Sequence, residues 1–175
     1  LTVIPKTRPL KVPPPKTFSL TLPQTLALLA AAGGDPVTHA MILTALHTGM
    51  RIAEILGLQW ESVDLLGRQL VVRTSLTRTG LMSPKNNRLR YLPLTRDLAA
   101  ELARLPHRSR DFVFTDGSGN HLNHAKARWR LSKCLERAGL PKTGWHTLRH
   151  TFASLLAQLG VPLPAIKGLL GHSAC

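Results

Sequence analysis

Residues 37–46 restrict the possible fold more than any other stretch, because apolar side chains occupy almost every side of the helix that they favour. Asp35 precedes this stretch as a helix cap, Pro36 suits the first helical turn, and Gly49 ends the helix. A helix that is apolar all round has to be buried. The sequence therefore predicts a globular domain that buries this helix, and 175 residues are enough to form such a core.

Most of the remaining sequence also favours helices. A first helix is expected from a cap at Ser19 or Thr21 to Ala32. The other segments expected to be helical are 51–56, 95–105, 124–138, 147–159 and 164–170. Two β-prone runs, 69–75 and 88–94, are expected to pair as antiparallel strands. The expected fold class is mainly α with a small antiparallel β-sheet.

Turn formers surround the β-prone runs. Residues 84–87 are expected to form the turn between the two strands, and residues 112–114 are expected to form a further short extended piece. The second run alternates, with Tyr91 on one side of the strand and Arg90 and Leu92 on the other.

The excess of basic residues indicates a polyanionic partner. The sequence has 23 Lys and Arg against 9 Asp and Glu, a net charge of +14 at pH 7. Such an excess attracts and steers polyanions, so nucleic acid is the first candidate partner and a membrane surface is the second. Charge alone indicates nothing about catalysis.

The first 18 residues differ in composition from the rest. Residues 1–18 contain prolines and basic residues but no acid, so they should stay extended. We interpret them as a basic interdomain linker, with a disordered tail as the alternative. The chain does not start like a signal peptide, has no apolar run of transmembrane length, and has only two cysteines. We expect a cytoplasmic protein without membrane contact.

One expected helix carries a row of basic side chains beside its apolar stripe. Within residues 124–138 a spacing of three or four residues puts four of them on one face: Lys126, Arg130, Lys133 and Arg137. Acids usually alternate with bases on a solvated face, whereas only Glu136 interrupts this row. We therefore predict that the row follows the phosphates of a nucleic acid.

His146 and Arg149 are expected to form an anion site. Their spacing of three residues puts them on one face, near a helix N-terminus that attracts anions. A guanidinium can hold two phosphate oxygens and stays charged when partly buried. The alternative is an ion pair that closes the core, but acids are scarce in this sequence. Arg51 is a second candidate, and Glu54 three residues later is its expected helix partner.

A metal site is the alternative use of His146 and His150, because residues four apart also share a helix face. The metalloprotease pattern requires a glutamate directly after the first histidine, and Thr147 occupies that position. No acidic or cysteine cluster offers a further ligand. We therefore expect neither a metal nor another cofactor.

Four sequence elements, in this order, resemble the active site of the tyrosine recombinases, the phage integrase family. They are Thr48-Gly-Met-Arg51, the run from Lys85 to Leu94, His146-Thr-Leu-Arg149-His150, and Leu170-Gly-His172. The resemblance extends from about residue 19 to the end of the chain and implies the catalytic-domain fold of that family. It also implies that the catalytic residues are Arg51, Lys85, His146, Arg149 and His172.

The resemblance further implies a mechanism. Members of the family cut one DNA strand with a tyrosine, form a 3′-phosphotyrosyl link, free a 5′-hydroxyl group, and then exchange and rejoin strands without a cofactor. Arg51, Arg149 and His172 would stabilise negative charge on the phosphate, where one donor typically contributes about 10²–10³ in rate. Lys85 would protonate the leaving 5′-oxygen, and His146 would accept or orient the tyrosine proton. The implied partners are double-stranded DNA and further copies of the full-length protein.

The sequence departs from the family at the nucleophile. Its only tyrosine, Tyr91, lies in an expected strand, whereas the family's tyrosine follows the Leu-Gly-His element. We therefore interpret residues 19–175 as a catalytic domain truncated before its nucleophile, which should bind DNA without cleaving it. The alternatives are a non-catalytic DNA-binding relative, a type IB topoisomerase-like enzyme, and a basic RNA-binding structural protein.

Overall fold

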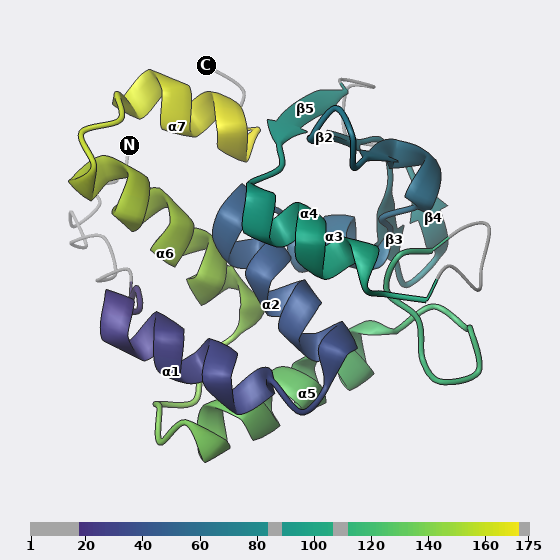
Figure 1. Cartoon of the computed structure of the whole chain (residues 1–175), viewed down its shortest axis with the longest axis horizontal. Helices are drawn as coiled ribbons and strands as arrows, with labels where there is room; N and C mark the ends of the chain where they lie inside the picture. The colour runs from purple at the N-terminus through teal and green to yellow at the C-terminus, as the bar shows by residue number, and fades with distance from the viewer. Residues whose placement is uncertain (1–17, 84–88, 107–111, 172–175) are drawn as a thin grey trace, which may run out of the picture.

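The computed structural model describes residues 18–83, 89–106 and 112–171. Helices surround α2 (Pro36–Thr48), and two small antiparallel sheets lie to one side of them (Figure 1). The other helices are α1 (Leu22–Ala32), α3 (Ile52–Leu56), the 3₁₀ turn η1 (Trp60–Ser62), α4 (Arg96–Ala103), α5 (His124–Arg137), α6 (Trp145–Gln158) and α7 (Leu163–Leu170). The expected class, mainly α with a small antiparallel sheet, is confirmed.

α2 is the buried central helix that the sequence predicts. The Asp35 carboxylate accepts the backbone N–H of Thr38 at 3.2 Å, and Gly49 ends the helix in the left-handed region at φ 64°. α1, α4, α5 and α6 all pack against α2. A Cβ atom on Gly49 would overlap the side chains of Phe152 and Leu170. Glycine therefore lets the end of α2 approach α6 and α7 closely.

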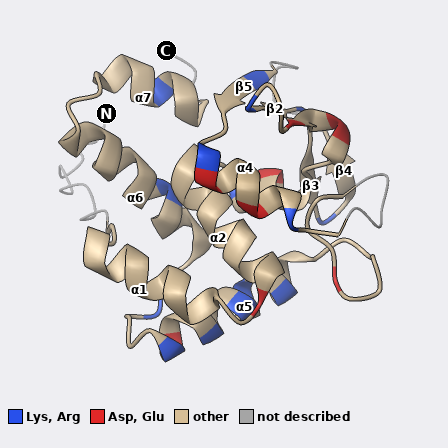
Figure 2. Cartoon of the chain, viewed as in Figure 1, with Lys and Arg blue, Asp and Glu red and all other residues tan. Residues whose placement is uncertain are grey.

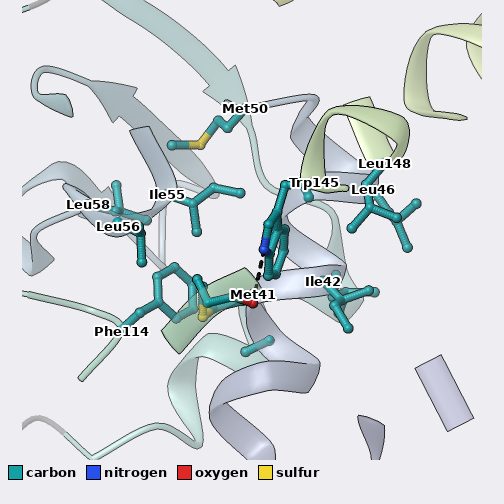
Figure 3. Packing of buried hydrophobic residues seen from close by; sticks show 14 of the residues in the cluster. Met41, Ile42, Leu46, Met50, Ile55, Leu56, Leu58, Phe114, Trp145 and Leu148 are labelled. Carbon is teal, nitrogen blue, oxygen red and sulfur yellow. Dashed lines mark hydrogen bonds between the residues drawn. The ribbon is translucent and has the colours of Figure 1, made fainter. Parts of the chain in front are cut away.

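Four of the described helices, α1, α2, α4 and α5, begin after a residue whose side chain caps them, whereas α6 has no such cap. Of the two expected caps, Ser19 and Thr21, it is Thr21 that caps α1, through a reciprocal capping box. α6 begins at Trp145 rather than at residue 147. The reason is a tertiary contact: the buried indole of Trp145 donates to the Ala127 carbonyl of α5 at 3.1 Å (Figure 3). His146 consequently lies in the first turn of α6.

The strands form a three-stranded sheet of order β1-β2-β5 and a separate β3-β4 hairpin. They are β1 (Val63–Asp64), β2 (Gln69–Val72), β3 (Ser75–Thr77), β4 (Gly80–Met82) and β5 (Arg90–Pro93). β2 and β5 pair in antiparallel fashion, as predicted, with Leu70 opposite Leu92. The expected extended piece at 112–114 contributes only an isolated bridge between Gln59 and Phe112.

The β3-β4 hairpin is a feature that the sequence does not predict. Residues 69–75 are expected to form one strand, but β2 ends at Val72. The Thr74 hydroxyl donates to the Gly57 carbonyl at 2.6 Å, and a Cβ atom on Gly57 would come within 2.9 Å of the Leu76 nitrogen. This packing against the end of α3 interrupts the strand. The expected turn at 84–87 lies outside the described residues.

The hydrophobic core forms around α2. Figure 3 shows Met41 and Ile42 of α2 near Trp145 of α6, Ile55 of α3 and Phe114. A second small cluster, made of Phe152, Ile166 and Leu170, joins α6 to α7. Within the described ranges, none of the helices combines the length and apolar character that crossing a membrane requires.

Candidate active site

Arg149 lies at the centre of the candidate site. Its side chain projects from α6 into the interior, and the residue is only 2% exposed. The guanidinium donates from Nη1 to the Gly49 carbonyl at 2.7 Å and from Nη2 to the Leu170 carbonyl at 2.6 Å. It thereby connects the ends of α2 and α7. The alternative of a core-closing ion pair does not apply, because no described carboxylate pairs with Arg149.

The charge of Arg149 is poorly compensated. Burial lowers the pKa of Arg149 to about 10, the positive charges of Arg51 and Arg90 add to this effect, and Glu54 opposes it. A pKa of about 10 still leaves the guanidinium protonated near neutral pH. The site therefore holds a buried cation that an incoming anion would stabilise.

Arg51 occupies the N-cap position of α3, two residues after the Gly49 that ends α2. Its backbone N–H donates to Glu54 Oε2 at 2.8 Å, and its guanidinium donates to Glu54 Oε1 at 3.2 Å. The expected partner of Arg51 is thus confirmed. The Arg51 side chain nevertheless remains 48% exposed, so the guanidinium is accessible to a ligand.

Arg90 of β5 is the residue of this region that sequence reasoning missed. It binds the same carboxylate at two points, with Nη2 to Oε2 of Glu54 at 2.8 Å and Nη1 to Oε1 at 3.3 Å. Burial raises the pKa of Glu54, but the hydrogen bond and charge of Arg90 and the Arg51 contacts outweigh this and hold it below its ordinary value. The available signal was the alternation of β5, which turns Arg90 inward with Leu92 and leaves Tyr91 exposed.

These four residues, Arg51, Glu54, Arg90 and Arg149, are called the arginine cluster below. Three guanidiniums and one carboxylate leave it with a net charge of +2. Its members come from α3, β5 and α6, which lie far apart in the sequence. Figure 2 shows basic positions on β5 and α6 and several more along α5. The cluster has the charge and the hydrogen-bond donors to bind a phosphate.

His146 and His150 of α6 flank Arg149 in the sequence. His146 is exposed in the first turn of α6, and its ring meets that of His150 edge-on at a centroid distance of 4.4 Å. Among the described residues, no three His, Cys, Asp or Glu side chains are grouped as metal ligands would be. The role of His146 stays a prediction.

Two of the five expected catalytic residues, Lys85 and His172, lie outside the described residues. The structure does place the chain just before His172, because the Leu170 carbonyl accepts from Arg149 and Gly171 lies against Arg90. Arg51 and Arg149 are the two expected residues that the structure brings together.

The basic row of α5 is less uniform than its spacing suggests. Lys126 pairs with Asp116 at 3.4 Å, and Lys133 pairs with Glu136 at 2.9 Å, both at exposed positions. Arg130 instead donates to Asp35 at 2.5 Å, and its side chain is only 23% exposed. Arg130 thus connects α5 to the cap of α2. The proposed contact of this row with phosphates stays a prediction.

Comparison with known proteins identifies the family. Residues 19–175 match the Phage integrase family. The chain belongs to this family. A tyrosine recombinase XerC-like protein of Caldanaerobacter subterraneus is 30% identical over 164 residues, which cover 77% of this chain and 42% of that relative. The chain spans roughly half the length of the curated phage integrase relatives that it matches.

Solved phage integrase structures share the fold. The integrase of transposon Tn1549, solved in complex with transposon right end DNA, has a TM-score of 0.77 and 26% identity, covering 90% of this chain and 59% of that one. The catalytic domain of bacteriophage HP1 integrase has a TM-score of 0.67 and 25% identity, covering 89% of this chain and 81% of that one. The expected tyrosine-recombinase catalytic-domain fold is thereby confirmed.

Proposed function

We propose that this chain is the phosphate-binding part of a tyrosine recombinase catalytic domain that cuts and rejoins DNA at specific sites. The observation that carries the proposal is Arg149, a buried guanidinium without a carboxylate partner among the described residues, next to the accessible Arg51. A scissile phosphodiester between them would supply the missing negative charge. Family membership supports the same reaction class.

In the proposed reaction, a tyrosine hydroxyl attacks the phosphorus atom and the 5′-oxygen leaves, which forms a 3′-phosphotyrosyl link. Arg51 and Arg149 would stabilise the charge on the non-bridging oxygens, and His172 would donate a further hydrogen bond. His146 would accept or orient the tyrosine proton, and Lys85 would protonate the leaving oxygen. Rejoining reverses these steps, so no metal or nucleotide cofactor is needed.

Tyr91 is a poor nucleophile for this reaction. It is the only tyrosine in the 175 residues, and it is exposed on β5 while its neighbours Arg90 and Leu92 face inward. Because alternate residues of a strand face opposite sides, the Tyr91 hydroxyl is directed away from the arginine cluster. We therefore propose that the nucleophile is not part of this chain, which by itself binds DNA without cutting it.

The proposed partner is double-stranded DNA. The net charge of +14 supports it, as does the DNA in the Tn1549 integrase complex. We also propose that residues 1–18 are a linker, that the domain proper starts at residue 19, where the family match begins, and that full-length copies assemble on DNA. A cytoplasmic location would give such a protein access to its substrate.

Covalent trapping tests the proposal. The full-length gene product is incubated with nicked suicide duplexes that carry candidate attachment sites, and DNA–protein adducts are resolved by denaturing electrophoresis. We expect an adduct with the unaltered protein and a yield reduced about 10²–10³-fold in Arg51→Gln. Arg104→Gln is the matched control, since Arg104 is also exposed and also pairs with a glutamate three residues away, Glu101 at 3.4 Å.

The same preparation separates the alternatives. DNA binding without an adduct on any site would favour a non-catalytic relative. Relaxation of a plasmid that carries no recombination site would favour a type IB topoisomerase-like enzyme. Tighter binding to structured RNA than to duplex DNA, with no specific effect of the Arg149→Ala change, would favour an RNA-binding structural protein.

A further inference from the structure

We infer that Arg90 is a positioning residue of the arginine cluster, which neutralises Glu54 so that Arg51 stays available to the phosphate. The inference rests on the proposed function, because it assigns a new role within the same site. Arg90 itself is 14% exposed and acts through Glu54 and Arg51 rather than on the substrate.

The geometry shows how Glu54 is shared. Arg90 approaches both carboxylate oxygens, at 2.8 and 3.3 Å, whereas the guanidinium of Arg51 makes a single contact of 3.2 Å. Two-point contacts between a guanidinium and a carboxylate are strong and directional. Glu54 is buried, so it needs a close cationic partner. Arg90 meets this need, which leaves the Arg51 side chain half exposed and only loosely held.

The charges of the cluster also indicate that Arg90 keeps Arg51 available to a phosphate. With Arg90 present, the cluster offers a phosphate a net charge of +2, since one guanidinium offsets Glu54 and two remain. Without Arg90, the carboxylate would draw Arg51 toward itself and compete with the phosphate for it. The site would then attract an anion with Arg149 alone.

Arg90 also touches the end of α7. A Cβ atom on Gly171 would overlap the Arg90 guanidinium, and Gly171 has a left-handed φ of 68°. The preceding carbonyl, that of Leu170, accepts from Arg149. Arg90 therefore lies between Glu54 of α3 and the residue that directly precedes His172, so it positions two parts of the site together.

The first test uses the 175-residue chain and inorganic phosphate, titrated by calorimetry. Arg90→Met removes the charge and keeps a long apolar stem, and we expect phosphate affinity to fall about 10-fold. In Glu54→Gln/Arg90→Met the competing carboxylate is also gone, while the glutamine oxygen can still accept the Arg51 N–H. We expect this pair to restore most of the affinity. Arg90→Lys should lose less affinity than Arg90→Met, because lysine keeps the charge but cannot make the two-point contact with Glu54.

The second test uses the full-length gene product and the rate of adduct formation at saturating suicide DNA. We expect Arg90→Met to slow the reaction about 10- to 100-fold, by analogy with residues that orient the ligands of catalytic metals. Glu54→Gln/Arg90→Met should recover much of the rate. Circular dichroism at the assay temperature confirms that each variant is folded, so lost stability alone would leave the rate per folded molecule unchanged.

The outcomes separate the two proposals. An unaltered chain that binds no phosphate, a folded Arg90→Met variant with unaltered affinity, or a double variant as weak as Arg90→Met would each overturn the role of Arg90. Phosphate binding that follows the expected order without any adduct would support the role of Arg90 and count against the recombinase reaction.

Discussion

Arg130 can be distinguished from the other basic residues of α5 by the salt dependence of DNA binding. Its guanidinium is held by Asp35 at 2.5 Å and by the Thr38 hydroxyl at 3.1 Å. The pairs of Lys126 and Lys133 are exposed, and such pairs exchange readily for a phosphate. Arg137 is exposed in the last turn of α5. We therefore expect Lys126, Lys133 and Arg137, but not Arg130, to contribute to phosphate binding.

The expected magnitudes follow from this difference. Each neutralised phosphate contributes about 0.9 to the slope of log K against log salt, so changing Lys126, Lys133 and Arg137 together to Ala should lower the slope by up to about 2.7. Arg130→Ala should change it by less than about 0.3. That variant instead loses a charged hydrogen bond at a partly exposed site, worth about 1–2 kcal/mol, which lowers Tm by roughly 2–8 °C.

Fluorescence anisotropy with a labelled duplex between about 50 and 200 mM salt measures the slope, and calorimetry measures Tm. The unaltered chain and the exposed Arg104→Ala variant serve as references. A slope change of about 0.9 in Arg130→Ala with an unaltered Tm would refute the structural assignment of Arg130. An unaltered slope in the triple variant would refute the contact between α5 and DNA.

Three further predictions concern the site and the core. Gly49→Ala should lower the free energy of unfolding by about 2–4 kcal/mol in urea titrations, because φ is 64° and the methyl group would overlap Phe152; a loss below about 0.5 kcal/mol would contradict this. The lowered pKa of Glu54 adds stability that is present above its unfolded value, 4.5, and is lost as pH falls through the folded-state pKa. Glu54→Gln should therefore flatten the acid side of the stability profile, and an equally steep profile would disprove the linkage. Trp145→Phe loses a buried hydrogen bond and should cost about 1–3 kcal/mol, whereas Trp129→Phe at an exposed position should cost less than about 0.5 kcal/mol; equal costs would contradict the packing.

Local chemistry explains the helices that could be predicted. Asp35 caps α2 and Gly49 ends it within a few residues of the apolar run, so those signals act without help from the rest of the chain. The start of α6 and the break after β2 could not be predicted in this way. They depend on the Trp145–Ala127 and Thr74–Gly57 hydrogen bonds, whose partners lie 18 and 17 residues apart.

The contacts of the candidate site likewise fall into local ones, which the sequence predicts, and long-range ones, which it does not. Arg51 could be paired with Glu54 from the sequence because the two residues are only three apart. The role of Arg130 could not, since its partner Asp35 is 95 residues away. The spacing along α5 shows where basic side chains point, but not which of them an acid from another helix will bind.

The amino-acid sequence was enough to establish a basic, mainly helical chain built around a buried helix. Net charge is a sum over the residues, and the periodicity that marks a helix is local, so neither depends on the packed fold. The family could also be inferred from the sequence, since each of its motifs is a short continuous stretch and the motifs follow one another in a fixed order. The packed fold was needed to show that Arg149 binds the carbonyl of Gly49, 100 residues away, and that Arg90 binds Glu54, 36 residues away. The first contact joins α6 to the end of α2 and the second joins β5 to α3, and no local pattern encodes the meeting of elements so far apart in the sequence.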